Sequence, residues 1–278
     1  TTPPFVAPLS GFGSGGFYTY LPLPYKVSCK VVIHAPKVQF YQINYATYPP
    51  DQPVTTFTPR LAAPQEESLK RAQRVLELAG GDLSELLMPS EGRTKVSRVS
   101  GSLTPGKPFT VFKANGGGRI LGLKIRPASA LAGKDRSVLL RMYWDGEKTP
   151  SVEAPVGDFF GVGFGEQADY ISLPLNETSG GYNCYWPMPF QKSARITVGT
   201  RSKVRVDSFY YNVDIETHDR LPKDSLYFHP QFRRVRTVRG KPVTLLETVL
   251  PDSSAPVYLV DAPRCFDRPG NPYTGPDG

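Results

Sequence analysis

An internal repeat constrains the fold of this chain more than any other feature of its sequence. The stretches at 15–31 (GGFYTYLPLPYKVSCKV) and 180–196 (GGYNCYWPMPFQKSARI) align without a gap and share a Gly-Gly pair, two prolines, a tyrosine and a serine. A second pair follows, FYQINY at 40–45 and YYNVDI at 210–215. In each copy a glycine turn leads into an aromatic strand, and the prolines interrupt that strand or confine it to a sheet edge. The repeat therefore predicts the closing half of an antiparallel sandwich, present twice.

The second copy also has an opening half. Strands are expected at 109–113, 120–126, 137–144 and 151–156. Asp145-Gly146-Glu147 is a hairpin turn signal between the last two. The first copy has only about a dozen residues before its glycine turn, so its opening half is expected from residues absent here or from another chain.

A single amphipathic helix is expected between the copies. Pro64 suits its first turn, Leu69, Ala72, Leu76 and Ala79 form an apolar stripe, and a Gly-Gly pair ends it. We expect this stripe to pack on a sandwich. The predicted fold is therefore all-β, with tandem jelly-roll β-sandwiches, one partial and one complete, joined by a short helical linker. The predicted boundaries are 1–59 for the closing half of the first jelly roll, 60–90 for the helical linker, 91–235 for the complete jelly roll and 236–278 for an extended C-terminal segment.

The charge and motif content excludes several classes of partner. The net charge is +8, and its densest basic run lies at 233–241. Such a run serves either as a solvated face or as a site for an anionic partner, and no nucleic-acid motif accompanies it, so nucleic acid is not expected. No apolar run approaches 18 residues, so no membrane span is expected. The cysteines form no CxxC pair and the histidines are scattered, so neither a metal nor a cofactor is expected.

Carboxylates are the strongest chemical signal in the sequence. Asp145, Glu147, Glu153 and Asp158 crowd one glycine-rich stretch. Cleavage of a glycosidic bond needs two carboxyl groups, about 5 Å apart for retention of configuration and farther apart for inversion. A hairpin can bring Glu147 or Asp145 near Glu153. Taken singly, each has an ordinary role as a turn or capping residue, and the two interpretations stand side by side.

Aromatic and basic side chains supply a second set of candidates. Trp186 and Tyr185 have the character of a platform on which sugar rings stack, although such residues are more often core or interface aromatics. His229 lies in YFHPQFRR, beside aromatics and Arg233, and is interpreted either as a ligand contact or as a buried, hydrogen-bonded histidine.

Four motifs in order carry a family resemblance: YWDGE, PSVEAPVGDFFGVGFG, YNCYWPMPFQKSARI and YFHPQFRR. Together they resemble glycoside hydrolase family 172, and 15–48 is similar to the additional N-terminal jelly roll of its longer members. The resemblance implies a tandem jelly-roll protein that acts on furanosides such as difructose dianhydrides and D-arabinofuranose polymers. It further implies homotrimers or multiples of trimers, a carbohydrate partner and an extracellular or periplasmic location.

The chain departs from this family at the catalytic positions. The family's two catalytic glutamates lie in GEGE and GTGTEDYF stretches of a later jelly roll, and neither stretch occurs here. The corresponding stretch of this chain is LLRMYWDGE…PVGDFFG. Aligned with the two catalytic stretches, it has Leu139 or Leu140 in place of the first glutamate and Gly157 in place of the second. No catalytic residue is therefore assigned, and the catalytic glutamate pair of the implied furanoside-cleaving hydrolase is expected to lie outside this chain. Two alternatives remain open: a structural jelly-roll subunit of an extracellular assembly, or a carbohydrate-binding module.

Overall fold

The computed structural model describes residues 2–240 apart from a few gaps. The gaps are residues 14, 85–92, 134, 204, 219–220, 223–224 and 237. The chain divides into two compact units, Thr1–Pro230 and Gln231–Gly278, which are described separately. The predicted extended C-terminal segment lies almost entirely outside the described residues.

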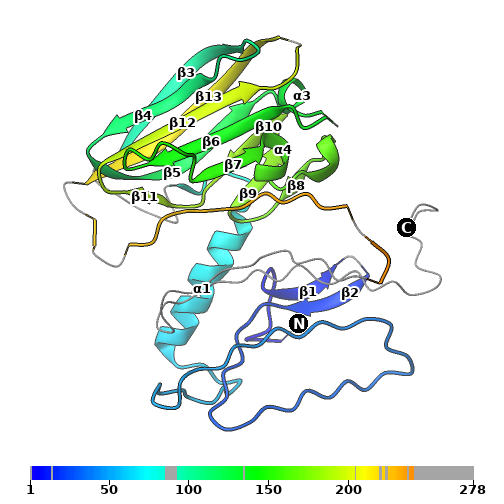
Figure 1. Cartoon of the computed structure of the whole chain (residues 1–278). Coiled ribbons are helices and arrows are strands. Elements are labelled where there is room, and N and C mark those ends of the chain that lie inside the picture. The colour runs from blue at the N-terminus through cyan, green and yellow to red at the C-terminus, as the bar shows by residue number, and fades with distance from the viewer. Residues whose placement is uncertain are drawn as a thin grey trace. The chain divides into compact units, whose positions relative to one another are not determined.

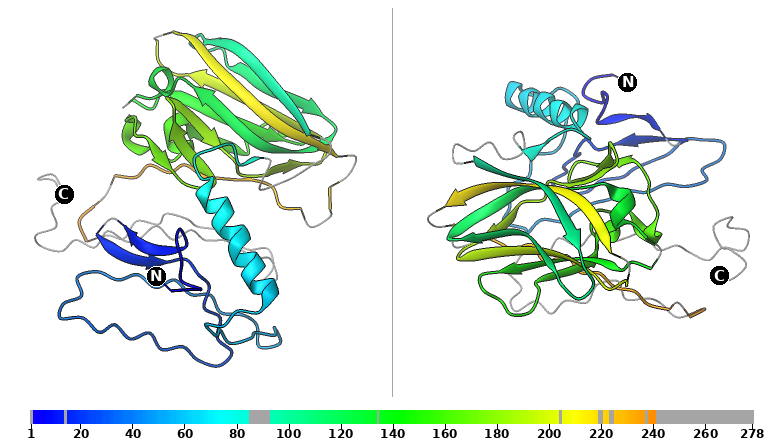
Figure 2. Two further views of the ribbon diagram at one scale, coloured as in Figure 1. Left: turned by 180° about the vertical axis from the view of Figure 1, so that it is seen from behind. Right: turned by 90° about the horizontal axis from the view of Figure 1, so that it is seen from above.

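Two antiparallel sheets form a sandwich in the first unit (Figures 1 and 2). The larger sheet has the strand order β3-β13-β5-β10-β9-β8, with β11 paired to β5, and the smaller has the order β4-β12-β6-β7. The strands are β3 (Arg93–Leu103), β4 (Phe109–Asn115), β5 (Gly117–Arg126), β6 (Val138–Trp144), β7 (Val152–Pro155), β8 (Tyr170–Ile171), β9 (Leu175–Thr178), β10 (Gly181–Cys184), β11 (Met188–Phe190), β12 (Ser193–Thr200) and β13 (Val206–His218). The predicted all-β sandwich is confirmed.

Alternation along the central strand β6 shows why the sandwich forms. Val138, Leu140, Met142 and Trp144 are buried, whereas the side chains between them lie on the opposite face. Successive side chains of a strand point to opposite faces, so this pattern gives one apolar face and one mixed face. Burial of such a face contributes about 25 cal/mol for each Å² removed from water.

The strand predicted at 151–156 ends one residue earlier than expected. Strand β7 stops at Pro155, and Val156 begins the short helix α4 (Val156–Phe159). Pro155 is the N-cap residue of α4, with a φ of −56° and a ψ of 142°, and the helical backbone begins after it. The remaining short helices are α3 (Ala128–Leu131) and the 3₁₀ helix η1 (Gly163–Gly165).

Helix α1 (Ala63–Glu77) confirms the predicted helix, but its stripe does not form a buried contact. None of its residues is fully buried, although Leu69, Ala72 and Leu76 of the stripe are half-buried, and residues that follow the helix contact the sandwich. Leu83 is fully buried, and Asp82 accepts a 2.5 Å salt bridge from Lys124 of β5. Burial raises the pKa of Asp82, but the bonds from Lys124 and Ser84 outweigh it and lower the pKa to about 2.

The first copy of the repeat forms only one hairpin. Strands β1 (Ser10–Gly13) and β2 (Gly16–Thr19) pair antiparallel, as expected for a glycine turn leading into an aromatic strand. The aromatic strand predicted at 40–45 is wrong, because 20–60 contains no strand. Phe17 and Phe40 are each 90% exposed. A strand is stabilised by hydrogen bonds to a neighbour, and the strands that complete the second copy have no counterpart among the described residues here.

Candidate functional site

Asp145 is a structural clamp in the turn after β6. Its Oδ1 accepts hydrogen bonds from the backbone N–H groups of Gln191 at 2.9 Å, Lys192 at 2.6 Å and Ser193 at 3.1 Å. Its Oδ2 accepts a hydrogen bond from the Tyr227 hydroxyl. Burial alone raises the pKa of Asp145, but these hydrogen bonds hold the pKa below its usual value. A carboxylate held ionised in this way is poorly suited to donate a proton.

The remaining predicted carboxylates have separate partners. Glu147 accepts a hydrogen bond from the Ser151 hydroxyl. Glu153 on β7 accepts bonds from Arg141 at 2.5 Å and Arg201 at 3.2 Å. Asp158 in α4 accepts both of its bonds, at 2.9 and 3.1 Å, from the Nε atom of Arg136.

The strand register keeps Asp145 and Glu153 apart. Arg141 of β6 lies opposite Glu153 of β7. Asp145 follows Arg141 by four residues, which is about 13 Å along an extended strand. This backbone offset exceeds the spacing of a retaining or inverting pair. The predicted hairpin pairing of Asp145 with Glu153 is therefore not what the structure shows.

Residues 225–230, which we call the strap, connect three of the predicted residues. The indole Nε1 of buried Trp144 donates a 2.9 Å hydrogen bond to the carbonyl of Phe228. The Phe228 ring stacks on Trp186, with centroids 6.5 Å apart. The Nδ1 atom of His229 lies 3.3 Å from the carbonyl oxygen of Ser151. With the bond from Tyr227 to Asp145, these contacts place Asp145, Trp186 and His229 along one segment.

Only one aromatic of the predicted platform is accessible. Trp186 is 42% exposed, whereas Tyr185 is 4% exposed and has the Lys124 ammonium over its ring. Tyr185 is therefore not a sugar-stacking surface, and Trp144 and Tyr182 are also buried. His229 is exposed, so its interpretation as a buried histidine is wrong.

Arg233 belongs to the second unit and is described by itself. Its side chain is exposed, and its Nη2 donates a 3.4 Å hydrogen bond to the Oε1 of Gln231. The surrounding basic residues Arg234, Arg236 and Arg239 are exposed as well.

The residues that align with the family's two catalytic glutamates are buried and apolar. Leu139 and Leu140 are 4% and 0% exposed. Gly157 is buried, and a Cβ atom added there would lie 3.0 Å from the carbonyl oxygen of Val162. A longer side chain therefore has no room at this position without a shift of the backbone.

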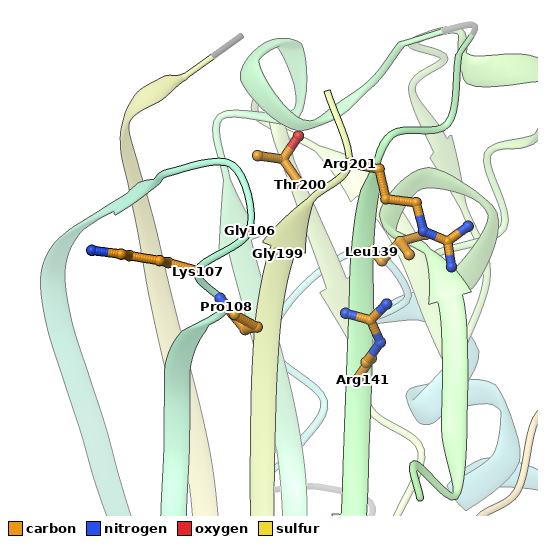
Figure 3. Close-up of a pocket in the computed structure, with 8 residues that line it drawn as sticks. All are labelled: Gly106, Lys107, Pro108, Leu139, Arg141, Gly199, Thr200 and Arg201. Atoms are coloured by element: carbon orange, nitrogen blue, oxygen red, sulfur yellow. The ribbon is translucent and has the colours of Figure 1, made fainter. Parts of the chain in front are cut away.

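Two cavities open on the smaller sheet, and sequence reasoning missed both. The first, of about 210 Å³, is lined by Leu139, Arg141, Gly199 and Arg201 together with the 106–108 turn (Figure 3). The second, of about 230 Å³, is lined among others by Lys113, Tyr143, Glu147 and Arg195. Strand alternation predicts that Arg141 and Tyr143 share one face of the sheet. Their neighbours on the adjacent strands depend on the strand register, which cannot be predicted from the sequence.

Glu177 is a further residue that sequence reasoning did not find. It is 1% exposed, on β9, and accepts a 3.3 Å hydrogen bond from the backbone N–H of Ala168. Burial, with the nearby charge of Asp169, raises the pKa of Glu177. Its cross-strand neighbour Tyr182 is fully buried. A carboxyl in the middle of a polar run, LNET, gives no sequence signal of such burial.

The described residues contain neither a metal-binding cluster nor a membrane-crossing helix. No group of three or more His, Cys, Asp or Glu side chains in that part of the chain is arranged to hold a metal ion. Its helices are too short or too polar to cross a bilayer.

The strand pairing defines an all-β sandwich protein, and comparison with family models identifies its family. A model described as GH172 domain-like matches residues 93–213, and a model described as the GH172 first beta-sandwich domain matches residues 1–65. The two matches lie in order along the chain and together cover about two thirds of it. The chain belongs to glycoside hydrolase family 172.

A short stretch is also similar to glycogen synthases. It is 59% identical over 39 residues to the enzyme of Thioalkalivibrio sulfidiphilus, which is 14% of this chain and 8% of that protein. It is 60% identical over 35 residues to the enzyme of Albidiferax ferrireducens, or 13% of this chain and 7% of that one. The chain spans less than a tenth of these curated relatives, so this likeness carries no function to it.

Proposed function

We propose that this protein takes part in the cleavage of furanosides, and that these 278 residues supply a scaffolding and sugar-contacting portion rather than the catalytic pair. The observation that supports this is the buried, apolar state of Leu139, Leu140 and Gly157 in a chain that belongs to a glycoside hydrolase family. Fructofuranosides and D-arabinofuranose polymers are the proposed substrate classes, and an extracellular homotrimer is the proposed form.

Incubation of the purified chain with each polymer tests this proposal. We expect immobilised D-arabinan or a fructan to retain the protein, and no reducing sugar to be released, because hydrolysis needs a pair of carboxyl groups and none is assigned among these residues. Release of reducing sugar would place a catalytic pair within these residues and overturn that part of the proposal. Absence of both retention and release would overturn the furanoside assignment. Light scattering after gel filtration tests the trimer.

Trp186 is the residue that we expect to contact the sugar. Its ring is 42% exposed and is supported from behind by Phe228, and stacking of a sugar ring on an indole uses such a held surface. Trp186→Ala is expected to weaken retention about tenfold without lowering the melting temperature, since aromatic contacts contribute about 1 kcal/mol or somewhat more.

Tyr210→Ala is the matched control for this variant. Tyr210 is 44% exposed on β13, so its removal takes away a similar exposed aromatic surface. Affinity electrophoresis in D-arabinan gels compares the two variants with the unchanged protein. Equal migration of Trp186→Ala and the unchanged protein would remove Trp186 from the sugar site.

The alternative function is that of a non-catalytic binding module. Exposure of Trp186 beside the strap favours it, because a lone supported indole serves binding as well as it serves a hydrolase. The two functions differ when the chain is combined with a hydrolytically competent member of the family. If this chain is part of a hydrolase, it is expected to form a defined oligomer with that member. If it is a binding module, it is expected to stay separate. Light scattering of the mixture distinguishes the two outcomes.

A further inference from the structure

The outward face of the smaller sheet carries rows of cationic side chains. Every second residue of β12 and β6 points inward to the core. The residues between them therefore lie on the outward face of the sheet. Arg195 of β12 pairs with Lys113 of β4 on one side and with Tyr143 of β6 on the other. Two residues along β12, Thr197 pairs with Arg141, which in turn lies opposite Glu153.

The two cavities lie at the ends of this face. Arg195 lines the second cavity and Gly199 lines the first. Four residues of an extended strand separate them, or about 13 Å. Thr197 lies between these two residues on β12, and Leu139 is paired with Gly199. Thr197 and Leu139 are only 3% and 4% exposed, so the longer side chains around them cover both. The face is therefore an elongated surface with a hollow at each end.

Positive charge dominates the first hollow. Arg141 and Arg201 share the single carboxylate of Glu153, and Lys107 adds a further cation to the lining. Figure 3 shows both guanidinium groups beside Leu139, whereas the Lys107 side chain extends from the 106–108 turn away from them. Two arginines on one carboxylate leave an excess of cationic donors that an added anion can satisfy.

The second hollow combines cations with an aromatic ring. The guanidinium of Arg195 lies 3.7 Å from the centroid of the Tyr143 ring, and Lys113 lies across the strand from Arg195. Glu147 is the acidic residue of the lining, and it accepts a hydrogen bond from Ser151. Stacking on Tyr143 fixes the orientation of the Arg195 guanidinium, which favours planar, bidentate contact with a carboxylate.

We propose that this outward face binds an anionic polysaccharide, whose carboxylates are received by Arg195 and Lys113 at one end and by Arg201 and Arg141 at the other, where Lys107 adds positive charge from the neighbouring turn. Charge complementarity and the length of the face select a chain rather than a small ion. A polysaccharide is favoured over a nucleic acid. Among the described residues that line the two cavities, Tyr143 is the only aromatic, and the Arg195 guanidinium already covers a face of its ring. Nucleic-acid platforms need free rings for base stacking. This inference is independent of the furanoside proposal.

Binding of polygalacturonate to the purified chain tests the inference. The exposed cations Lys107, Lys113 and Arg201 are replaced together by alanine, and the matched control replaces Lys26, Lys70 and Arg74, which are exposed elsewhere and remove the same charge. We expect the first variant to lose about tenfold or more in affinity at low salt and the control to lose less than about twofold. Equal losses in both variants, or no binding by the unchanged chain, would overturn the proposal.

Two further arms separate this site from the alternatives. Retention on neutral D-arabinan is expected to be unchanged in the triple variant, so that failure of one proposal leaves the other standing. A single-stranded oligonucleotide is expected to displace polygalacturonate only weakly. Displacement at a lower concentration than that of free polygalacturonate would assign the face to nucleic acid and overturn the inference. Binding is also expected to weaken as salt rises, since the contacts are charged and exposed.

Discussion

Trp144→Ala is expected to lower the free energy of unfolding by about 4 kcal/mol, the largest effect of any substitution discussed for this protein. The indole is 1% exposed in the core and donates its N–H to the carbonyl of Phe228. The variant therefore leaves a large cavity and an unpaired carbonyl on the strap. Chemical denaturation followed by circular dichroism measures the loss.

Trp144→Phe separates the two contributions. Phenylalanine keeps most of the apolar volume but cannot donate the hydrogen bond, so a smaller loss of about 1–2 kcal/mol is expected. The chain has two tryptophans, so this variant leaves Trp186 as the sole tryptophan, which is excited selectively at wavelengths that tyrosine does not absorb. We expect its emission to shift to longer wavelength, because release of Phe228 uncovers the stacked side of the Trp186 ring. An unchanged emission would show that the strap stays in place without Trp144.

Asp145→Ala is expected to cost about 3 kcal/mol of unfolding free energy. The substitution removes the acceptor of three backbone N–H groups and of the Tyr227 hydroxyl. It also places alanine at a φ of +52°, where the left-handed conformation is unfavourable for residues other than Gly, Asn and Asp. Thermal unfolding near neutral pH checks the loss.

Asp145→Asn is the control, and the pH dependence gives the second readout. Asparagine tolerates the backbone angle and keeps an acceptor oxygen, so most stability should be retained. The folded-state pKa of Asp145 is depressed. Its charge therefore contributes stability that is present above the unfolded value of about 3.9 and is lost as pH falls through the folded-state pKa. The gap between the unchanged protein and the Asn variant should shrink below about pH 4, and a constant gap would contradict this role.

Local patterns predict the sandwich strands well and the first copy poorly. The alternation over 137–144 and the glycines before 120–126 predict strands that the structure confirms as β6 and β5. The repeat assigns the same strands to 40–45, where none forms. The difference is physical: similar side chains at 210–215 lie between β3 and β5, which supply backbone hydrogen bonds on both sides. Side-chain pattern alone does not provide those partners.

The candidate site is less predictable than the fold, because its residues meet across strands. Asp145 is recognisable as a turn residue from Asp-Gly, but its bonds to 191–193 join segments far apart in sequence. Glu153 reads as half of a carboxylate pair, yet the register sets it against Arg141. Tyr185 and Trp186 are adjacent, and only the structure shows which of the two is accessible.

The segment at 20–60 also determines how the first part of the chain acquires its structure. It carries exposed apolar side chains, among them Val27, Phe40 and Tyr45, and none of its residues is paired in a strand. If a strand pairs with this segment, the origin of that strand determines the kinetic order of the pairing step. A strand from the same polypeptide makes the step independent of protein concentration, whereas a strand from a second copy makes its rate rise with concentration. The sandwich at 93–218 has its paired strands within the chain, so its folding remains unimolecular in either case.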